Sequence, residues 1–252
     1  MLKKIAQSLQ KLPHKFKKAE IPVTWIRKND YSWLSQQFIK DFVKLQKTAF
    51  STKIENLAQD TNKLGPQPLW EGYASNNIGG STRMPNNVRT SSTMGNIYTY
   101  LVQKRQPSII VEFGTAFGVS GMYFLAGIEL NHKGNLLTFE PNDVWRNIAE
   151  KNLLQISEKF SSISGTFEDN IDNVLPQSKT IDMAFIDAIH TKEFVMSQLE
   201  IVLAKCSNKA IIILDDINFS DSMNECWAEI SVDGRFSCSV ELGKRVGILE
   251  VA

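Results

Sequence analysis

The sequence predicts an α/β protein built on a doubly wound, seven-stranded and mostly parallel sheet. Three observations support this prediction. From residue 109 onward, short apolar runs alternate with helical patterns, as in parallel strands joined by crossover helices. Several of the apolar runs end in an acidic residue. The last two runs are joined only by residues 243–245, so we expect them to form an antiparallel C-terminal hairpin.

The positions of the elements follow from this alternation. Helical spacing of apolar residues predicts helices at 119–130, 143–158, 192–204 and 221–231. A further helix, from Met94 to Lys104, leads into the first strand. The strands are expected at 109–113, 136–140, 162–167, 181–187, 210–215, 236–242 and 246–251.

The first part of the chain has a different character. Residues 1–53 contain 12 Lys or Arg and three acidic residues, whereas the remainder contains 16 basic and 24 acidic residues. Helical patterns at 2–12 and 31–60 precede a segment rich in turn residues, 61–96. We interpret this segment as a lid or substrate loop, with an exposed linker as the alternative. The predicted organisation is a helical extension with this loop at 1–88 and a ligand-binding catalytic domain at 89–252.

The sequence also constrains location and partners. A basic helix at 2–12 could contact an anionic membrane surface, but one short helix is a weak anchor, so packing on the domain or in a homodimer is favoured. No apolar run approaches the roughly 18 residues of a membrane span. The N-terminus lacks the apolar core of a signal peptide. Three scattered cysteines, Cys206, Cys226 and Cys238, do not form a zinc or disulfide pattern. We therefore expect a cytoplasmic protein.

The turn after the first strand predicts a ligand-binding loop. Gly114 and Gly118 let the backbone bend and a ligand approach closely. Free N–H groups at the start of the following helix favour an anion, and Thr115 and Ser120 carry hydroxyl donors. The Gly-x-x-x-Gly-x-x-Gly spacing differs from the dinucleotide-binding pattern. Glu112 would repel a pyrophosphate and suits a cationic group, such as the ammonium of an amino acid.

The ends of the next two strands predict a nucleoside site. Glu140 lies 22 residues after Gly118, where an acid can accept hydrogen bonds from both ribose hydroxyls. The alternative is that Glu140 only favours the start of the next helix. Thr166, Phe167 and Glu168 follow the third strand and are candidates for contacts with an adenine.

Acidic residues gather at the ends of the fourth and fifth strands. Asp187, Asp215 and Asp216 would repel one another unless a cation or a proton lies among them. Their oxygens suit Mg²⁺, which could hold two substrate oxygens. In the alternative without a metal, the aspartates bond to backbone or cofactor. His190 in the same crevice is a candidate general base or a structural histidine, and Asn218 is expected nearby.

Taken in order, these motifs resemble the class I S-adenosylmethionine-dependent methyltransferases. Residues 111–118 (Val-Glu-Phe-Gly-Thr-Ala-Phe-Gly) resemble the first motif of that family, and residues 137–140 resemble its ribose-binding motif. Residues 185–190 and 213–217 resemble the later motifs of its small-molecule O-methyltransferase branch. The resemblance covers roughly residues 90–252 and implies a Rossmann-like methyltransferase fold.

The resemblance also implies roles for particular residues. Glu112 and Gly114 would hold the methionine part of S-adenosylmethionine, and Glu140 its ribose. Asp187, Asp215 and Asp216 fall where metal-dependent members place their ligands. Two departures count against a catecholic substrate. Asp216 stands where catechol-type members usually have Asn, and Lys192 matches the usual catalytic lysine only loosely.

The function expected is methyl transfer to a hydroxyl of a small molecule, with Asp187 and His190 as the catalytic candidates and Mg²⁺ as a candidate second cofactor. The hydroxyl would need to be deprotonated, with the help of a metal or by His190. Three alternatives stay open: an aminopropyl transferase on the same fold, an RNA methyltransferase, and a cofactor-binding scaffold without turnover. The basic residues 1–53 suggest the RNA alternative, but Lys-rich segments are usually solvated and the interleaving of aromatic with basic residues is weak, so nucleic acid is not favoured.

Overall fold

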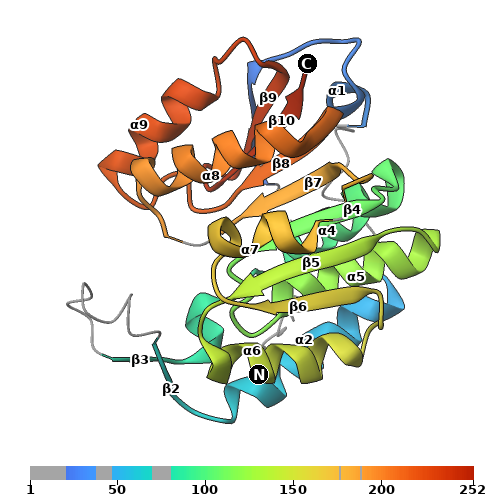
Figure 1. The fold of residues 1–252 in the computed structure, drawn as a ribbon, viewed down its shortest axis with the longest axis vertical. Helices are drawn as coiled ribbons and strands as arrows, with labels where there is room; N and C mark the ends of the chain where they lie inside the picture. The colour runs from blue at the N-terminus through green and yellow to red at the C-terminus, as the bar shows by residue number, and fades with distance from the viewer. Residues whose placement is uncertain (1–20, 38–46, 70–80, 176, 188) are drawn as a thin grey trace, which may run out of the picture.

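The computed structural model describes residues 21–37, 47–69, 81–175, 177–187 and 189–252. Within these residues one sheet contains eight strands in the order β1-β9-β10-β8-β7-β4-β5-β6 (Figure 1). The strands are β1 (Val23–Arg27), β4 (Ile109–Phe113), β5 (Asn135–Glu140), β6 (Phe160–Ser164), β7 (Ile181–Ile186), β8 (Cys206–Leu214), β9 (Phe236–Leu242) and β10 (Val246–Val251). A separate pair is formed by β2 (Gln67–Pro68) and β3 (Thr82–Arg83).

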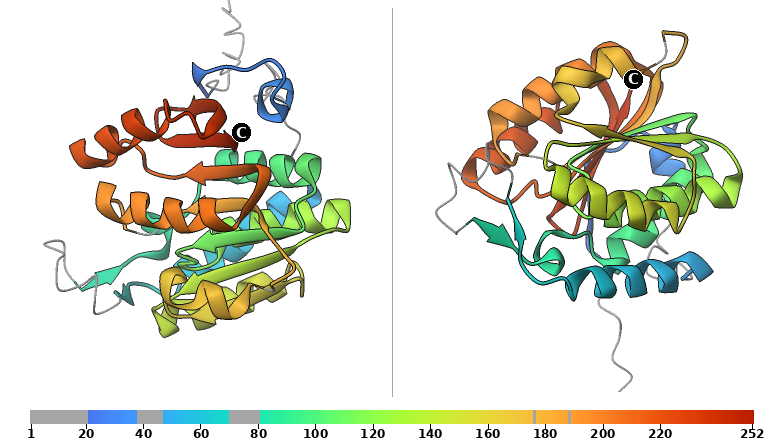
Figure 2. Two further views of the ribbon diagram at one scale, coloured as in Figure 1. Left: turned by 45° about the horizontal axis from the view of Figure 1, so that its top comes forward. Right: turned by 60° about the horizontal axis from the view of Figure 1, so that its bottom comes forward.

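Helices cover both faces of this sheet (Figure 2). The core on one face includes residues of α1 (Trp33–Gln37), α2 (Ala49–Asn62), α4 (Ser92–Arg105), α5 (Val119–Asn131) and α6 (Asp143–Leu154). The core on the other face includes residues of α7 (Phe167–Val174), α8 (Lys192–Lys205) and α9 (Asp221–Ile230). A short 3₁₀ helix, η2 (Pro85–Val88), precedes α4.

The strand order creates a switch point beside β4. This strand pairs in parallel with β5 on one side and with β7 on the other. Crossovers run to opposite sides of β4, and ligands of such sheets bind beyond the C-terminal ends of the strands at this point. The doubly wound α/β fold is confirmed. The predicted hairpin is also confirmed, since β9 and β10 are antiparallel neighbours at the predicted residues.

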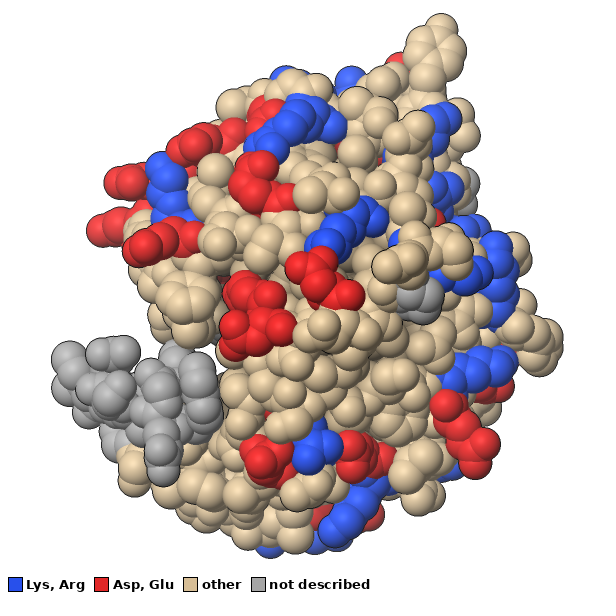
Figure 3. Space-filling view, viewed as in Figure 1, with Lys and Arg blue, Asp and Glu red and all other residues tan. Residues whose placement is uncertain are grey.

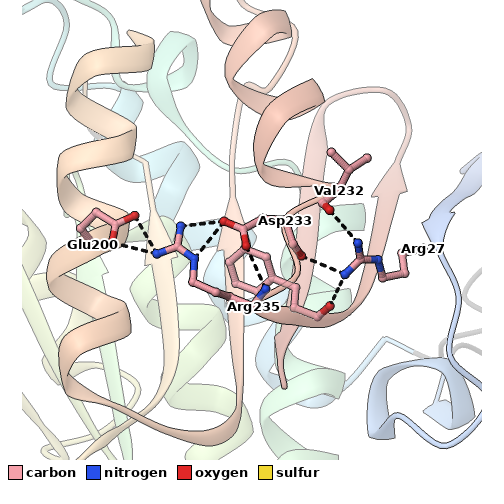
Figure 4. Close-up of polar contacts among 6 residues, drawn as sticks. Arg27, Glu200, Val232, Asp233 and Arg235 are labelled. Carbon is pink, nitrogen blue, oxygen red and sulfur yellow. Dashed lines mark hydrogen bonds and ion pairs between the residues drawn. The ribbon is translucent and has the colours of Figure 1, made fainter.

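The eighth strand, β1, corrects the prediction of seven strands and of a purely helical extension. It pairs antiparallel with β9. Arg27 secures it by donating hydrogen bonds of 2.6 to 2.9 Å to the main-chain oxygens of Val232, Asp233 and Phe236 (Figure 4). Such a contact joins residues more than 200 positions apart. No local pattern could have predicted it.

The segment around residue 165 also differs from the prediction. The strand expected at 162–167 lies at Phe160–Ser164, and the unpredicted helix α7 begins at Phe167. Thr166 causes this change because its hydroxyl accepts a hydrogen bond from the N–H of Asp169 and caps the helix. The helix expected at 143–158 ends at Leu154.

Predictions about the first 88 residues have mixed outcomes. The helix predicted at 31–60 is represented by α1 and α2, with residues 38–46 outside the described part. The basic helix at 2–12 also lies outside it. Helix α2 packs on α5, and the division of the chain at residue 88 stays a prediction. None of the described helices is long and apolar enough to cross a membrane.

Candidate active site

A cavity of about 810 Å³ lies beyond the C-terminal ends of β4, β5, β7 and β8. Strand ends that are far apart in the sequence therefore contribute to one site. Nine of the residues singled out from the sequence line this cavity: Gly114, Glu140, Thr166, Phe167, Glu168, Asp187, His190, Asp215 and Asp216.

Four other predicted ligand contacts do not line the cavity. Glu112, Thr115 and Ser120 are 0%, 1% and 6% exposed, and Gly118 begins α5 behind the turn. Direct contact of these residues with a ligand stays a prediction. The position of Glu112 follows from the alternation of β4, which directs Phe113 toward one face of the sheet and Glu112 toward the helix α5 on the other.

Glu112 instead supports the turn from below. Its Oε2 accepts a hydrogen bond of 2.6 Å from the hydroxyl of Thr138, whereas its Oε1 has no hydrogen-bond partner. Burial raises the pKa of Glu112 to about 7, against the opposing effect of the Ser120 and Thr138 hydroxyls. A Cβ at Gly121 would lie 3.0 Å from the Glu112 Oε2, so a glycine in α5 leaves room for this carboxylate.

Glu140 joins two turns at the cavity wall. Its Oε2 accepts a hydrogen bond of 2.8 Å from the N–H of Ala116, and its Oε1 accepts one of 2.9 Å from the N–H of Asn142. Burial raises the pKa of Glu140 to about 7, although these two hydrogen bonds act in the opposite direction. Each carboxylate oxygen keeps a further acceptor position, which a ligand hydroxyl in the cavity could use.

Aromatic rings form the floor beside Glu140. Phe167, at the start of α7, packs against Phe113 and Phe139 with ring centroids 3.8 Å and 5.4 Å away. The three rings come from three different elements and are buried in the sheet-facing core. They place an apolar surface next to the carboxylate, as a nucleoside site requires.

The opposite end of the cavity is acidic. His190 Nε2 lies 3.6 Å from Asp187 Oδ1 and 3.6 Å from Asp216 Oδ2, and its ring packs against Phe219 at 5.2 Å between centroids. Burial lowers the pKa of His190, against the opposing charges of Asp216 and Asp215. Burial, followed by the same two carboxylates, holds the pKa of Asp187 well above its usual range. A neutral His190 can accept a proton.

Arg245 is the residue of this site that sequence reasoning missed. It was treated only as part of the β9–β10 turn. Its Nε and Nη2 lie 3.1 Å and 3.2 Å from the two oxygens of Asp215, and its Nε lies 2.8 Å from Asp216 Oδ1. The sheet register explains its position, because Gly247 pairs with Leu214.

On the face drawn in Figure 3, acidic and basic side chains both reach the surface, and acidic ones gather near its middle.

Asp215, one of the three predicted magnesium ligands, is held by other partners in this structure, whereas Asp187 and Asp216 lie close enough to His190 to share a metal ion with it. Asp215 Oδ1 accepts hydrogen bonds from Arg245 and from the N–H of Asp216, and Asp215 Oδ2 accepts one from Arg245. Asp215 is therefore committed to a guanidinium. The set whose ligand atoms lie within 4.8 Å of one another is Asp187, His190 and Asp216, and Asp216 also contacts Arg245.

Two other residues that were expected near the active site lie outside the cavity lining. Lys192, compared with the usual catalytic lysine of the family, forms an ion pair of 2.7 Å with Glu229 and does not line the cavity. Asn218 is exposed and likewise does not line it. Neither residue is positioned to contact a ligand in this cavity.

The segment predicted as a lid or substrate loop contributes the remaining wall. Residues on both sides of 70–80, which lie outside the described part, line the cavity. Arg89 is held there by an ion pair of 2.6 Å with Glu55, whose other oxygen accepts a hydrogen bond from the Tyr123 hydroxyl. The lining residues from this segment are Leu69, Arg83, Asn86, Asn87, Val88 and Arg89.

Comparison with known proteins gives a consistent result. Residues 111–217 match the model of a family described as a methyltransferase domain. An O-methyltransferase from Bacillus cereus in complex with SAH is 18% identical with a TM-score of 0.58, and the alignment covers 88% of this chain and 98% of that one. A putative caffeoyl-CoA O-methyltransferase from Staphylococcus aureus is 17% identical with a TM-score of 0.58, covering 87% and 100%. No curated protein matches the sequence.

A third structure extends the range of organisms. The O-methyltransferase TomG from Streptomyces achromogenes, in complex with SAM, is 13% identical with a TM-score of 0.59, and the alignment covers 87% of this chain and 94% of TomG. At such identities the likeness establishes the fold. The fold is therefore that of the class I methyltransferases. The match to the methyltransferase-domain model covers residues 111–217, which lie within this fold.

Proposed function

We propose that this protein transfers a methyl group from S-adenosylmethionine to a hydroxyl group of a small molecule. One observation carries the proposal. Glu140, at the end of β5, and Asp187, at the end of β7, line one cavity at the switch point of a methyltransferase fold. The O-methyltransferase neighbours, two of which hold SAH or SAM, support the same cofactor and reaction here.

The nucleoside end is built to orient the cofactor. Glu140 accepts hydrogen bonds from the ribose hydroxyls through the lone pairs that Ala116 and Asn142 leave free. Phe167 provides the apolar surface against which an adenine rests, beside Thr166. Gly114 lets the turn pass close to the ligand. These contacts direct the methyl-bearing end toward the acidic half of the cavity.

The acidic end holds the acceptor and its proton. When bound, the cofactor supplies an electrophilic methyl group on a sulfonium. His190 would accept the hydroxyl proton at Nε2, so that the acceptor oxygen could take the methyl group that the bound cofactor would supply. Asp187 and Asp216 flank the His190 Nε2 and stabilise the imidazolium that forms. This arrangement supports His190 as general base and Asp187 as its partner.

Several finer predictions remain proposals. A small-molecule acceptor agrees with the volume of the cavity and with the exposed rings of Phe194 and Phe219 on its rim. A cytoplasmic location, a homodimer and contact of the basic helix with a membrane stay predictions from the sequence. No observation on the described residues favours the RNA or scaffold alternatives.

The substitution Glu140→Ala tests the cofactor site. Loss of two hydrogen bonds to a carboxylate should weaken S-adenosylmethionine binding about 10- to 100-fold. Isothermal titration calorimetry measures this change. Glu158→Ala removes an exposed carboxylate that does not line the cavity and should leave the affinity unchanged. Equal affinities of wild type and Glu140→Ala would contradict the proposed cofactor site.

A further inference from the structure

Arg245 occupies an unusual position in the acidic half of the cavity. We propose that its guanidinium is the permanent cation of the acceptor site, that it replaces a divalent metal ion there, and that it orients the acceptor oxygen. The inference concerns one end of the proposed active site and therefore rests on the proposed function. It goes beyond that function because it assigns Arg245 to the cation position that the sequence predicted for Mg²⁺.

The first support is the set of contacts that Arg245 makes. Asp215 is only 4% exposed and receives two hydrogen bonds from the guanidinium, one to each oxygen. The same Nε lies 2.8 Å from Asp216 Oδ1. One side chain thus bridges two of the three carboxylates predicted to bind the metal. Arginine is suited to this role because its planar fork matches a carboxylate and it stays charged at all relevant pH values.

The second support is that the backbone fixes Arg245 in this place. Its carbonyl oxygen accepts a hydrogen bond of 2.9 Å from the N–H of Ile217, and its own N–H donates one of 3.1 Å to the oxygen of Leu242. The turn after β8 and the β9–β10 turn are therefore tied together. Asp215 is fixed from the other side by the N–H of Asp216. The guanidinium and the two aspartates come to the site as one unit.

The third support is the competition that a metal ion would meet. A cation among Asp187, His190 and Asp216 would have to share Asp216 with a guanidinium, and like charges repel at this range. Mg²⁺ also demands a nearly ideal octahedron of oxygen ligands. Here Arg245 binds Asp215, one of the three predicted carboxylate ligands. The third possible ligand is then the nitrogen of His190.

Arg245 is also placed to meet the acceptor. Its side chain is 47% exposed and lines the cavity. The contacts with Asp215 and Asp216 use Nε and Nη2. Nη1 has no hydrogen-bond acceptor among the described residues and can donate to an acceptor oxygen. Such a contact would hold the oxygen while His190 removes its proton.

Manganese binding tests this inference without any acceptor. The full chain is stripped with EDTA and titrated with Mn²⁺, and free Mn²⁺ is measured by electron paramagnetic resonance. We expect no saturable site in the wild type. Arg245→Gln should bind one Mn²⁺ at least about tenfold more tightly, because a unit positive charge beside the carboxylates is removed. The added substitution Asp216→Asn should abolish the gained site.

Arg235→Gln is the matched control. Arg235 is 43% exposed and also contacts two carboxylates, those of Glu200 and Asp233, but it does not line the cavity (Figure 4). Its substitution should leave Mn²⁺ binding as weak as in the wild type. Arg245→Lys keeps the charge and should also show no gained site. Circular dichroism verifies that each variant is folded.

Two outcomes would overturn the proposal. One is a wild-type protein that binds a single Mn²⁺ with a Kd below about 100 μM, a result independent of whether any variant folds. The other is a folded Arg245→Gln that gains no affinity. Failure of the proposed function would look different. S-adenosylmethionine would then not bind in calorimetry, or would bind without methyl transfer to any hydroxyl compound, whatever the Mn²⁺ result.

Discussion

Two buried glutamates show how position decides the role of a carboxylate. Glu112 and Glu140 sit at or next to the ends of neighbouring strands, and burial raises the pKa of each to about 7. Glu140 faces the cavity and is held by two backbone N–H groups. Glu112 is fully buried with one oxygen unpaired. The first is suited to bind a ligand, and the second influences mainly the stability of the fold.

The substitution Glu112→Gln tests this role through the pH dependence of stability. The pKa of Glu112 is about 7 in the folded protein and about 4.5 in the unfolded chain, so the folded state holds this proton more tightly. The resulting stabilisation is fully present below pH 4.5 and is lost as the pH rises through 7. Between pH 5 and 7.5 the wild type should lose about 2 kcal/mol of unfolding free energy through Glu112 alone. Glu112→Gln lacks this loss.

Urea unfolding at pH 5 and pH 7.5 measures the difference. Glu140 titrates in the same direction and remains in both proteins, so a smaller pH dependence should persist in the variant. If the wild type and Glu112→Gln lose equal stability between pH 5 and pH 7.5, Glu112 is already ionised at pH 5. That result would contradict a raised pKa of Glu112.

At the scale of single residues, the sequence predicted the residues that line the cavity better than the residues that hold them in place. Glu140, Asp187 and His190 were found because strand ends in an α/β sheet converge on one crevice. Glu112 lies one residue before the end of its strand and faces the other side of the sheet, so its predicted contact with a ligand stays untested. Arg245 was not predicted because the pairing of β10 with β8, which brings its turn beside Asp215, joins parts of the chain that are distant in sequence.

The turn between β4 and α5 illustrates how one element positions another. Gly118 caps α5 with a φ of 82°, a conformation that a side chain disfavours. A Cβ at this residue would lie 3.3 Å from the backbone of Ala149 in α6. The glycine predicted as a ligand contact is therefore needed for the close packing of α6 against the turn.

Gly118→Ala should reduce the unfolding free energy by about 1 to 3 kcal/mol through backbone strain and overpacking. Chemical denaturation measures this change. Gly234→Ala is the control, since its added Cβ would meet nothing within 4 Å and its φ is not in the left-handed region. Unchanged stability of Gly118→Ala would mean that α6 moves freely and that the turn is not rigid.

The elements themselves were predicted with uneven success. The bounds of β9 and β10 agree with the sequence because clear apolar runs flank a short glycine turn. Helix α7 was not predicted although Phe167, Ile171 and Val174 have helical spacing, because its first residue was assigned to the strand expected at 162–167. Strand β1 was missed because only Trp25 and Arg27 are partly buried in it, which leaves a weak alternation.

For the whole molecule, the central claim is that one cavity at the switch point of the sheet holds both a nucleoside and an acceptor. The cavity collects groups from strand ends, from the β9–β10 turn and from residues 82–89. Periodicity in the sequence could predict the strand ends, since it reports local structure. It could not predict the contributions of the turn and of residues 82–89, because these depend on packing between distant parts of the chain.

A crystal structure of the full chain with S-adenosylhomocysteine tests this claim most directly. The account predicts that both ribose hydroxyls lie within hydrogen-bond distance of the Glu140 carboxylate, with the adenine beside Phe167. The sulfur should point toward Asp187 and His190. A nucleoside bound outside this cavity, or one whose ribose is turned away from Glu140, would contradict the account.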